Sequence, residues 1–565
     1  MNAQGPGQVK LENHLRQHLS LDDRRKMERS FEAISPFEFK NELIRLASEK
    51  SKQGAATLLN AGRGNPNWIA ATPREMFFML GNFALEESKR VWSAGHLAGK
   101  PSKQGIAERM HIFLNNHETD ETSKWLRSFV EYGNSRGFPP DDWVFELVDG
   151  IIGDNYPEPD RMLTYTEKVV HDFLIREICQ NQSPSSNFEL FAVEGATAAM
   201  CYLFNTLLEN HLLNRGDKIA IAVPIFPPYV EIPELHKYNF HVINLYASGI
   251  DNRGEHTWQY PKEELDKLKD PSVKALFLVN PSNPPSVAMS PQCIDEIAQI
   301  IHQHNRELII ISDDVYATFV DEYCSLLAKL PRNTIGVYSL SKYFGVTGWR
   351  LGVIAIHPDH VLNDKLGDLP DQIQEELANR YRSLTQHPEK LSVMERLVAD
   401  SREVALNHTA GLSTPQQIQM AMFTWFALTE DGQRYKQQTR DICRHRMALL
   451  YEGLGLPQPN LAYCADYYTE FDLEVWAKHH YGDAFFEFLA AHYEPVDILF
   501  RLAEQSAIVL LNGGGFAGPK WSIRVSLANL NDEAYSDIGK YLHQALESYV
   551  AAWRGQESPN GLPSS

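Results

Sequence analysis

The stretch Ser339-Leu-Ser-Lys-Tyr-Phe-Gly-Val-Thr-Gly-Trp-Arg-Leu-Gly352 decides the fold, because it places Lys342 three residues after Ser339, one after Ser341 and eight before Arg350. A lysine amine can bind an aldehyde cofactor covalently, and hydroxyl and guanidinium groups can bind the phosphate of that cofactor. Pyridoxal 5'-phosphate meets both conditions. The stretch therefore predicts that Lys342 is the catalytic residue and that the other three residues bind the phosphate; the alternative is a surface lysine in an ordinary turn.

The segment Ile309-Ile-Ile-Ser-Asp-Asp-Val-Tyr316 offers partners for a pyridine ring. Such a ring draws electrons only while its nitrogen is protonated, which requires a buried carboxylate beside it. Asp313 follows an apolar run that is typical of a buried strand, and Asp314 is the neighbouring alternative. Tyr316 is expected to donate a hydrogen bond to the phenolic oxygen of the ring.

Two further segments suit the phosphate and the face of the ring. Gly195, Ala196 and Thr197 follow an apolar strand and begin an alanine-rich helix, and the amides at such a helix start bind phosphate. Phe226 follows the next strand and can stack on the ring. The alternatives are that Gly195 merely ends a strand and that Phe226 belongs to the core.

Short apolar runs bounded by turn residues recur along the chain and alternate with helical stretches. This pattern is typical of an α/β fold with a largely parallel, seven-stranded sheet. Ligands bind at the carboxyl ends of the strands in such sheets, and the candidate residues follow the runs. The runs span residues 188–193, 218–223, 240–247, 273–279, 307–312, 334–339 and 350–356.

Together with Asn283 in Asn280-Pro-Ser-Asn-Pro-Pro-Ser286 and Arg524 in Ser522-Ile-Arg-Val-Ser-Leu-Ala-Asn529, these residues resemble the fold type I aspartate aminotransferase family, which depends on pyridoxal phosphate. The resemblance implies a large domain plus a smaller α/β domain, and it favours Asp313 over Asp314 at the ring nitrogen. It assigns Asn283 to the ring oxygen, although Pro285 and Ser286 depart from the usual Asn-Pro-Thr-Gly motif. It assigns Arg524 to the α-carboxylate of the substrate, for which the planar guanidinium is well suited.

Four segments also resemble the aspartate 4-decarboxylase branch of this family. They are Ser35-Pro-Phe-Glu-Phe-Lys40, Gly62-Arg-Gly-Asn-Pro-Asn-Trp68, Asn155-Tyr-Pro-Glu-Pro-Asp-Arg-Met162 and Ala405-Leu-Asn-His-Thr-Ala-Gly-Leu-Ser-Thr-Pro-Gln-Gln417. This resemblance implies β-decarboxylation of L-aspartate to L-alanine and carbon dioxide, with a side activity that transaminates pyruvate or another 2-oxo acid. An aspartate aminotransferase with little decarboxylation is the alternative.

The same resemblance assigns roles to residues outside the cofactor motifs. Lys40, Arg63 and Gly64 are expected in the substrate site, with solvated surface charges as the alternative for the two cations. Tyr156 is expected to reach the cofactor of a neighbouring subunit, and its alternative is an aromatic residue in a turn. His408 has only the resemblance in its favour, and a structural histidine is the more common case.

The charge of the chain argues against nucleic-acid and membrane partners. It carries 73 acidic and 53 basic residues, a net charge of -20. A non-catalytic effector-binding module of a transcription regulator would need a basic helix-turn-helix segment, and residues 1–75 contain none. Six cysteines without metal-ligand spacing indicate a reducing compartment without disulfides or metal, and no apolar leader is present. A cytoplasmic protein is expected.

The length of 565 residues predicts more than one domain. The large domain, which binds the cofactor, carries helical insertions near residues 86–145 and 358–410. The resemblance implies that these insertions assemble homodimers into a higher oligomer, up to a dodecamer. The expected order is an N-terminal arm (1–30), the first part of the small domain (31–75), the large domain (76–430), the second part of the small domain (431–552) and a disordered tail (553–565).

Overall fold

The computed structural model of the chain describes residues 19–52, 57–182, 187–402 and 411–557. His408, the first 18 residues and the end of the predicted tail therefore lie outside the described residues. No helix within the described ranges is both long and apolar enough to cross a membrane. All six cysteines of the chain are free.

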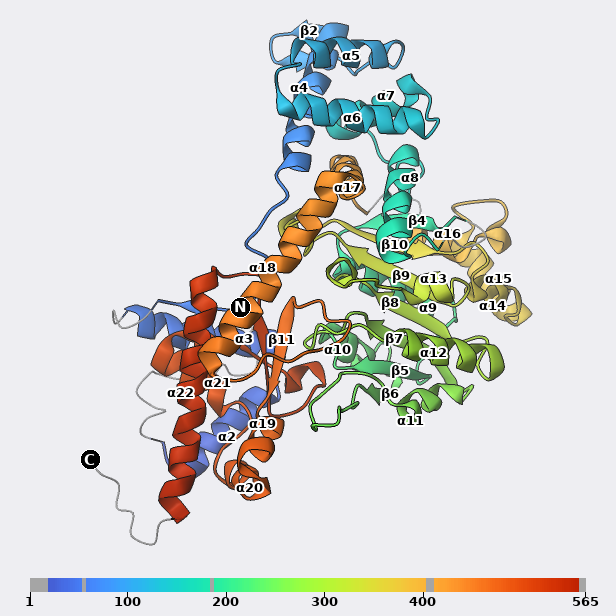
Figure 1. The fold of residues 1–565 in the computed structure, drawn as a ribbon. Coiled ribbons are helices and arrows are strands. Elements are labelled where there is room, and N and C mark those ends of the chain that lie inside the picture. Colours follow the sequence, from blue (N-terminus) through green and yellow to red (C-terminus); the bar gives the residue numbers. More distant parts are fainter. Residues whose placement is uncertain (1–18, 53–56, 183–186, 403–410, 558–565) are drawn as a thin grey trace, which may run out of the picture.

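A seven-stranded sheet occupies the middle of the chain, as the apolar runs predict (Figure 1). Its order is β4-β10-β9-β8-β7-β5-β6, and only β10 runs against its neighbours. The carboxyl ends of the other six strands therefore meet at one edge. The strands are β4 (Glu189–Val193), β5 (Lys218–Val223), β6 (His241–Tyr246), β7 (Val273–Val279), β8 (Ile309–Asp313), β9 (Thr334–Ser339) and β10 (Gly352–Ile356).

Apart from the partly exposed edge strand β6, the sheet is buried on both faces, which explains why its strands are mostly apolar. In β5, Ile219 and Ile221 pack into one hydrophobic cluster, whereas Ala220 and Ala222 pack into another on the opposite face. The first cluster includes α8 (Thr164–Phe173), α9 (Ala196–Glu209) and α17 (Thr414–Ala427), and the second includes α12 (Pro291–Gln303). The fold is thus an α/β fold of layered helices around a mostly parallel sheet.

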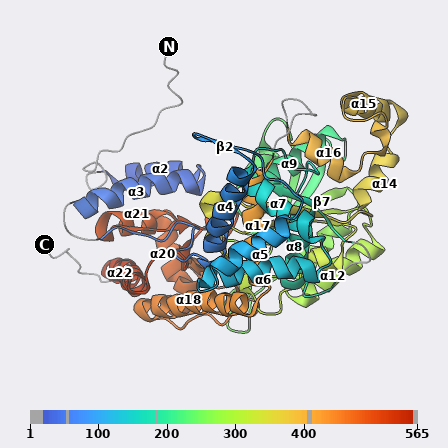
Figure 2. The same cartoon turned by 90° about the horizontal axis from the view of Figure 1, so that it is seen from above.

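Segments from both ends of the chain share a separate hydrophobic cluster. It contains α3 (Pro36–Lys52), α18 (Glu430–Leu454), α21 (Asp497–Ser506) and α22 (Asp532–Glu557), which lie on one side of the molecule (Figure 2). A three-stranded sheet of order β11-β14-β13 belongs here, and β1 (Leu59–Asn60) pairs with β12 (Ile508–Val509). The three strands are β11 (Tyr468–Asp472), β13 (Leu511–Asn512) and β14 (Ser522–Ser526).

Two groups of helices extend the large core. After α4 (Thr72–Val91) and the short hairpin β2 (Ser93–Ala94) and β3 (Leu97–Ala98), three helices lie together at the upper end of Figure 1. They are α5 (Ile106–Asn116), α6 (Glu121–Ser135) and α7 (Pro140–Ile152). The second group is α14 (Val361–Gly367), α15 (Asp371–Tyr381) and α16 (Val393–Asp400), at the opposite side from α3.

Candidate active site

A cavity of about 170 Å³ opens at the carboxyl edge of the large sheet, against the small sheet. Most of the predicted site residues line it, although they come from segments far apart in the sequence. The predicted residues in its wall are Gly64, Ala196, Thr197, Phe226, Asn283, Asp313, Tyr316, Ser339, Ser341, Lys342, Arg350 and Arg524. The sheet topology thus brings a cation, an amine and a carboxyl group to one place.

Lys342 is partly buried just beyond the end of β9. Its Nζ donates a hydrogen bond to the carbonyl oxygen of Gly64 across 3.1 Å, and the hydroxyl of Tyr467 donates to the same oxygen across 2.8 Å. A Cβ on Gly64 would lie only 2.9 Å from this Nζ. The absence of a side chain at Gly64 therefore leaves the amine accessible from the cavity.

Asp313 and Asp314 occupy different environments at the end of β8. Asp313 lines the cavity and accepts a hydrogen bond from the hydroxyl of Tyr229 across 3.3 Å. Asp314 is turned to other hydroxyls, including that of Tyr323 at 3.0 Å, and is absent from the cavity wall. Burial, aided by the charge of Asp314, raises the pKa of Asp313 to about 7, so a cationic partner would favour its ionised form.

The phosphate end of the cavity surrounds the start of α9. Gly195 precedes this helix with a φ of +87°, and a Cβ there would lie 2.8 Å from Nη2 of Arg350. Glycine is thus required for the close approach, although Gly195 itself does not line the cavity. Arg350 donates hydrogen bonds to the carbonyl oxygens of Thr347 and Glu194, across 3.0 and 3.1 Å. A helix start, a fixed guanidinium and the hydroxyls of β9 suit a phosphate group.

Arg524 is a buried cation at the other end of the cavity, on β14. Its Nη1 donates to Oδ1 of Asn283 and its Nη2 to the carbonyl oxygen of Gly62, each across 3.0 Å. Its Nε has no hydrogen-bond partner in the part of the chain that the structure describes. Glu470 pairs with it across the strands, but burial raises the pKa of this carboxyl to about 8. A buried guanidinium beside a largely neutral carboxyl group suits an anionic ligand.

Three predicted residues other than Gly195 do not line the cavity. Tyr156 is 71% exposed, and Arg63 is exposed next to Gly64. Lys40 is half-buried on α3, one helical turn from Phe37, which does line the cavity. Burial lowers the pKa of Lys40, and the charges of Arg524 and Arg63 lower it further. The three cations therefore form a positive region at this end.

The Asn283 loop has a connection that its motif did not reveal. Ser286 adopts a φ of +61° and its Oγ accepts a hydrogen bond from the backbone N–H of Tyr468 across 2.9 Å. Its carbonyl oxygen accepts from the backbone N–H of Ala465 across 2.7 Å. The serine that departs from the family motif therefore fastens this loop to the beginning of β11.

Sequence reasoning missed three aromatic residues at the site. Phe37 and Tyr468 line the cavity, and Tyr229 supports Asp313 from α10 (Pro228–Glu234). Successive side chains of a strand face opposite sides, so one of the neighbouring Tyr467 and Tyr468 was bound to face inward, which could have drawn attention to them. No pattern assigned a role to Tyr229, or to Phe37 within the segment Ser35–Lys40, because their roles arise from contacts between distant segments.

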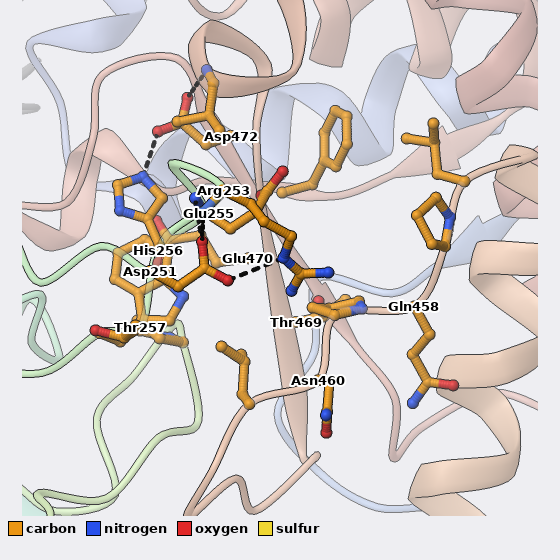
Figure 3. Close-up of a pocket in the computed structure, with 18 of the residues that line it drawn as sticks. Asp251, Arg253, Glu255, His256, Thr257, Gln458, Asn460, Thr469, Glu470 and Asp472 are labelled. Atoms are coloured by element: carbon orange, nitrogen blue, oxygen red, sulfur yellow. Dashed lines mark hydrogen bonds and ion pairs between the residues drawn. The ribbon is translucent and has the colours of Figure 1, made fainter. Parts of the chain in front are cut away.

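A second cavity, of about 520 Å³, lies between the hairpin of residues 249–259 and the helix α19 (Leu473–Tyr481) (Figure 3). His256 contacts Asp472 there, with 2.9 Å between Nε2 and Oδ2. None of the predicted site residues lines it, and no lysine is among its lining residues. Despite its size, this cavity lacks the amine that the predicted chemistry requires.

Comparison with known proteins identifies the family that the chain resembles over most of its length. The sequence model of the family described as aminotransferase class I and II matches residues 165–538. A Pseudomonas protein described as a bifunctional aspartate aminotransferase and L-aspartate beta-decarboxylase is 46% identical over 529 residues, which cover 93% of this chain and 98% of that protein.

Solved structures show the same fold. Aspartate aminotransferase from Thermus thermophilus with maleate has a TM-score of 0.54 at 16% identity, covering 90% of this chain and 96% of its own. N-succinyldiaminopimelate aminotransferase from Mycobacterium tuberculosis has a TM-score of 0.53 at 15% identity, covering 93% and 99%. With the family match and the near full-length relative, these findings establish that the chain belongs to the aminotransferase class I and II family, which depends on pyridoxal phosphate.

Proposed function

We propose that the protein binds pyridoxal 5'-phosphate in the 170 Å³ cavity and converts L-aspartate to L-alanine and carbon dioxide. Transamination between aspartate and a 2-oxo acid such as pyruvate is the second activity. The observation that carries this proposal is the 46% identity, over nearly the whole chain, to a relative named for both reactions. The cavity that joins Lys342, Asp313 and Arg524 supports it from the structure.

The cavity wall fits the cofactor from end to end. Ala196, Thr197 and Arg350 would hold the phosphate together with the two serines of the Lys342 stretch, and Asp313 would pair with the ring nitrogen. Phe226 would cover the ring, and Tyr316 and Asn283 would bind its phenolic oxygen. When bound, pyridoxal phosphate supplies an electron sink for the electron pair of a bond broken at the substrate.

Lys342 and Arg524 divide the work on the substrate. Arg524 would bind the α-carboxylate through the guanidinium N–H groups that make no hydrogen bond to the described residues, among them that of Nε. That grip places Cα toward Lys342, whose amine stands beside Gly64 at the same end of the cavity. Lys342 would then take the Cα proton and return it, as a general base and acid.

The β-carboxylate requires a weaker hold than the α-carboxylate does. An interaction that stabilises the bound substrate more than the transition state slows the loss of carbon dioxide. Lys40 and Arg63 add positive charge near Arg524 without lining the cavity, so they attract a dicarboxylate while making no close ion pair in its wall. We assign the β-carboxylate to this region, next to Gly64.

The proposal extends to assembly and location. Tyr156 is exposed and does not line the cavity of its own chain, which suits the contribution to a neighbouring subunit that the resemblance implies. A homodimer is then the smallest active unit, and dimers assemble further, up to a dodecamer. Six free cysteines are in keeping with a reducing, cytoplasmic location.

Product analysis tests the proposed function. Purified holoenzyme is incubated with L-aspartate in a weakly buffered solution, and alanine, oxaloacetate and carbon dioxide are counted. We expect mainly alanine, one carbon dioxide per alanine, and a rising pH because each decarboxylation consumes one proton. Oxaloacetate as the main product, formed only while a 2-oxo acid acceptor is present, would replace the proposal by a simple aspartate aminotransferase.

A further inference from the structure

The hydroxyl groups in the wall of the active-site cavity fall into two sets. Ser339 and Ser341 hydrogen-bond each other across 2.9 Å and, with Thr197 and Thr347, lie at the phosphate end. The other set is a pair of phenols near the substrate end, Tyr316 and Tyr468. A reaction that adds a proton to the substrate therefore has few donors to draw on among the lining residues.

Tyr468 stands between the two groups that handle the substrate. The guanidinium carbon of Arg524 lies 4.2 Å from the centre of its ring. A Cβ on Gly64 would lie 2.7 Å from the Tyr468 hydroxyl and 2.9 Å from Nζ of Lys342, so the hydroxyl and the amine flank the same small volume. A substrate bound by Arg524 with its Cα near Lys342 would therefore lie close to this hydroxyl.

The two phenols share one hydrogen bond, of 2.9 Å between their oxygens. Only one of them can donate in it, so the pair keeps one further proton that is free to be donated. The resemblance commits Tyr316 to the cofactor's phenolic oxygen. Tyr468 is then the donor in the shared hydrogen bond, and its proton reaches the substrate when its hydroxyl turns from Tyr316 toward the space beside Gly64.

β-Decarboxylation needs protons at two neighbouring carbons. Lys342 acts at Cα, from which it removes a proton and to which it later returns one. Cβ loses its bond to the carboxylate and needs a new proton that did not come from Cα. With a second acid on the substrate side of the cavity, proton transfer at Cβ would not have to wait until the group that acts at Cα is protonated again.

We propose that Tyr468 is a further catalytic residue, whose hydroxyl delivers the proton that replaces the departing carboxylate at Cβ. The C–C bond to the β-carboxylate breaks and carbon dioxide leaves. The electron pair of that bond forms the new C–H bond at Cβ, and the O–H bond of Tyr468 breaks. Arg524 stabilises the resulting phenolate, which regains a proton from water, and this accounts for the one proton consumed per turnover.

This inference rests on the proposed function, and its test separates the two transfers. Tyr468→Phe keeps the ring against Arg524 and removes only the hydroxyl. We expect it to lower alanine formation from aspartate by about 100-fold. Exchange of the Cα hydrogen of L-alanine in heavy water, followed by NMR, needs Lys342 but not Tyr468, and should change by less than about threefold.

Two readouts and a control complete the test. Binding of pyridoxal phosphate, titrated by absorbance, and the unfolding temperature of the apo-protein should match the wild type. Tyr451→Phe is the matched control, because Tyr451 reaches the same strand from another side, at Thr469 across 3.2 Å, and does not line the active-site cavity. It should form alanine at the wild-type rate.

The remaining outcomes overturn the inference. Alanine formation by Tyr468→Phe within about threefold of the wild type would show that another group protonates Cβ. If Tyr468→Phe also lost Cα exchange, cofactor binding or folding, the result would show that Tyr468 has a structural role and does not donate the proton. Tyr468→His, which restores a proton donor, should recover alanine formation, and a histidine variant no better than phenylalanine would also count against it. If the wild type itself forms no alanine, the proposed function is what fails.

Discussion

Nη1 of Arg524 donates a hydrogen bond to Oδ1 of Asn283 across 3.0 Å, and this contact joins β14 of the small sheet to the loop after β7 of the large sheet. Asn283 thereby fixes the plane of the guanidinium that faces the substrate. This hydrogen bond therefore aligns the part of the cavity formed by the small sheet with the part formed by the large sheet.

The first prediction concerns this pair. Arg524→Ala should raise the KM for aspartate by about 10- to 100-fold, because hydrogen bonds to a charged group contribute about 1.5–3 kcal/mol. Asn283→Ala leaves the guanidinium in place but removes its positioning contact and the proposed hydrogen bond to the cofactor, and it should raise KM by about fivefold. Steady-state kinetics with aspartate measures both. An unchanged KM in the Arg524 variant would mean that another cation binds the α-carboxylate.

Lys342→Ala should abolish turnover while the protein stays folded, because the same amine binds the cofactor covalently and moves the Cα proton. The wild-type holoenzyme should be yellow, and borohydride should remove the colour and fix the cofactor to the chain. Lys329, whose Nζ pairs with Asp295 on the surface, offers the control Lys329→Ala. Full turnover by the Lys342 variant would contradict the central assignment.

The contribution of Asp313 and Asp314 to the stability of the apo-protein should decrease with rising pH. The pKa of Asp313 is raised to about 7 and that of Asp314 to about 6, above the value of about 3.9 in an unfolded chain. Between these values the folded state binds more protons than the unfolded state, so the free energy of unfolding falls as pH rises from about 4 to 7. Asp313→Asn should flatten this dependence in part, since Asp314 still titrates.

Thermal unfolding of apo-protein at a series of pH values measures this effect. Asp295→Asn, an exposed carboxylate on α12, is the control and should follow the wild type. A variant at Asp313 with the full wild-type slope would show that its carboxyl group does not titrate with a raised pKa.

The partition between alanine and oxaloacetate should respond to the cations beside Gly64. Lys40→Ala or Arg63→Ala should shift the product ratio more than it shifts cofactor binding, by up to about tenfold for each 1.4 kcal/mol of differential stabilisation. Lys52→Ala, at the end of the same helix as Lys40, should leave the ratio unchanged. A ratio indifferent to both substitutions would place the β-carboxylate elsewhere.

Subunit mixing tests the role of Tyr156. Exchange between Lys342→Ala and Tyr156→Phe subunits should restore part of the lost activity, because one site of each mixed dimer then has both residues. Mixing Lys342→Ala with Asp313→Asn should restore none, since those two residues line one cavity. Absence of recovery after verified exchange would argue against a shared site.

Most of the seven strands could be predicted because both faces of the sheet are buried, so that strands other than the partly exposed edge strand β6 are largely apolar runs. The cofactor end followed from the same logic, since Asp313 and Lys342 stand directly at or beyond strand ends. The local sequence predicts the position of these residues because the end of the strand before each of them determines where it lies.

The substrate end was less accessible to sequence reasoning. Phe37, Gly64 and Tyr468 meet only because α3 and β11 pack against the large sheet, and no local pattern encodes that packing. Lys40 was expected in the substrate site, yet its helix directs it beside the cavity rather than into the wall. Tyr229 supports Asp313 through a contact between residues 84 positions apart.

The pairing of β1 with β12 has a consequence for how the chain is made. A ribosome adds Leu59 long before Ile508, yet these two residues are neighbours in one small sheet. Arg350 is the last residue of the predicted phosphate site in the sequence, so this site is fully synthesised long before Ser522 and the rest of β14 leave the ribosome. During synthesis, the residues that would bind the phosphate of the cofactor are therefore all present before Arg524, which would bind the amino-acid substrate.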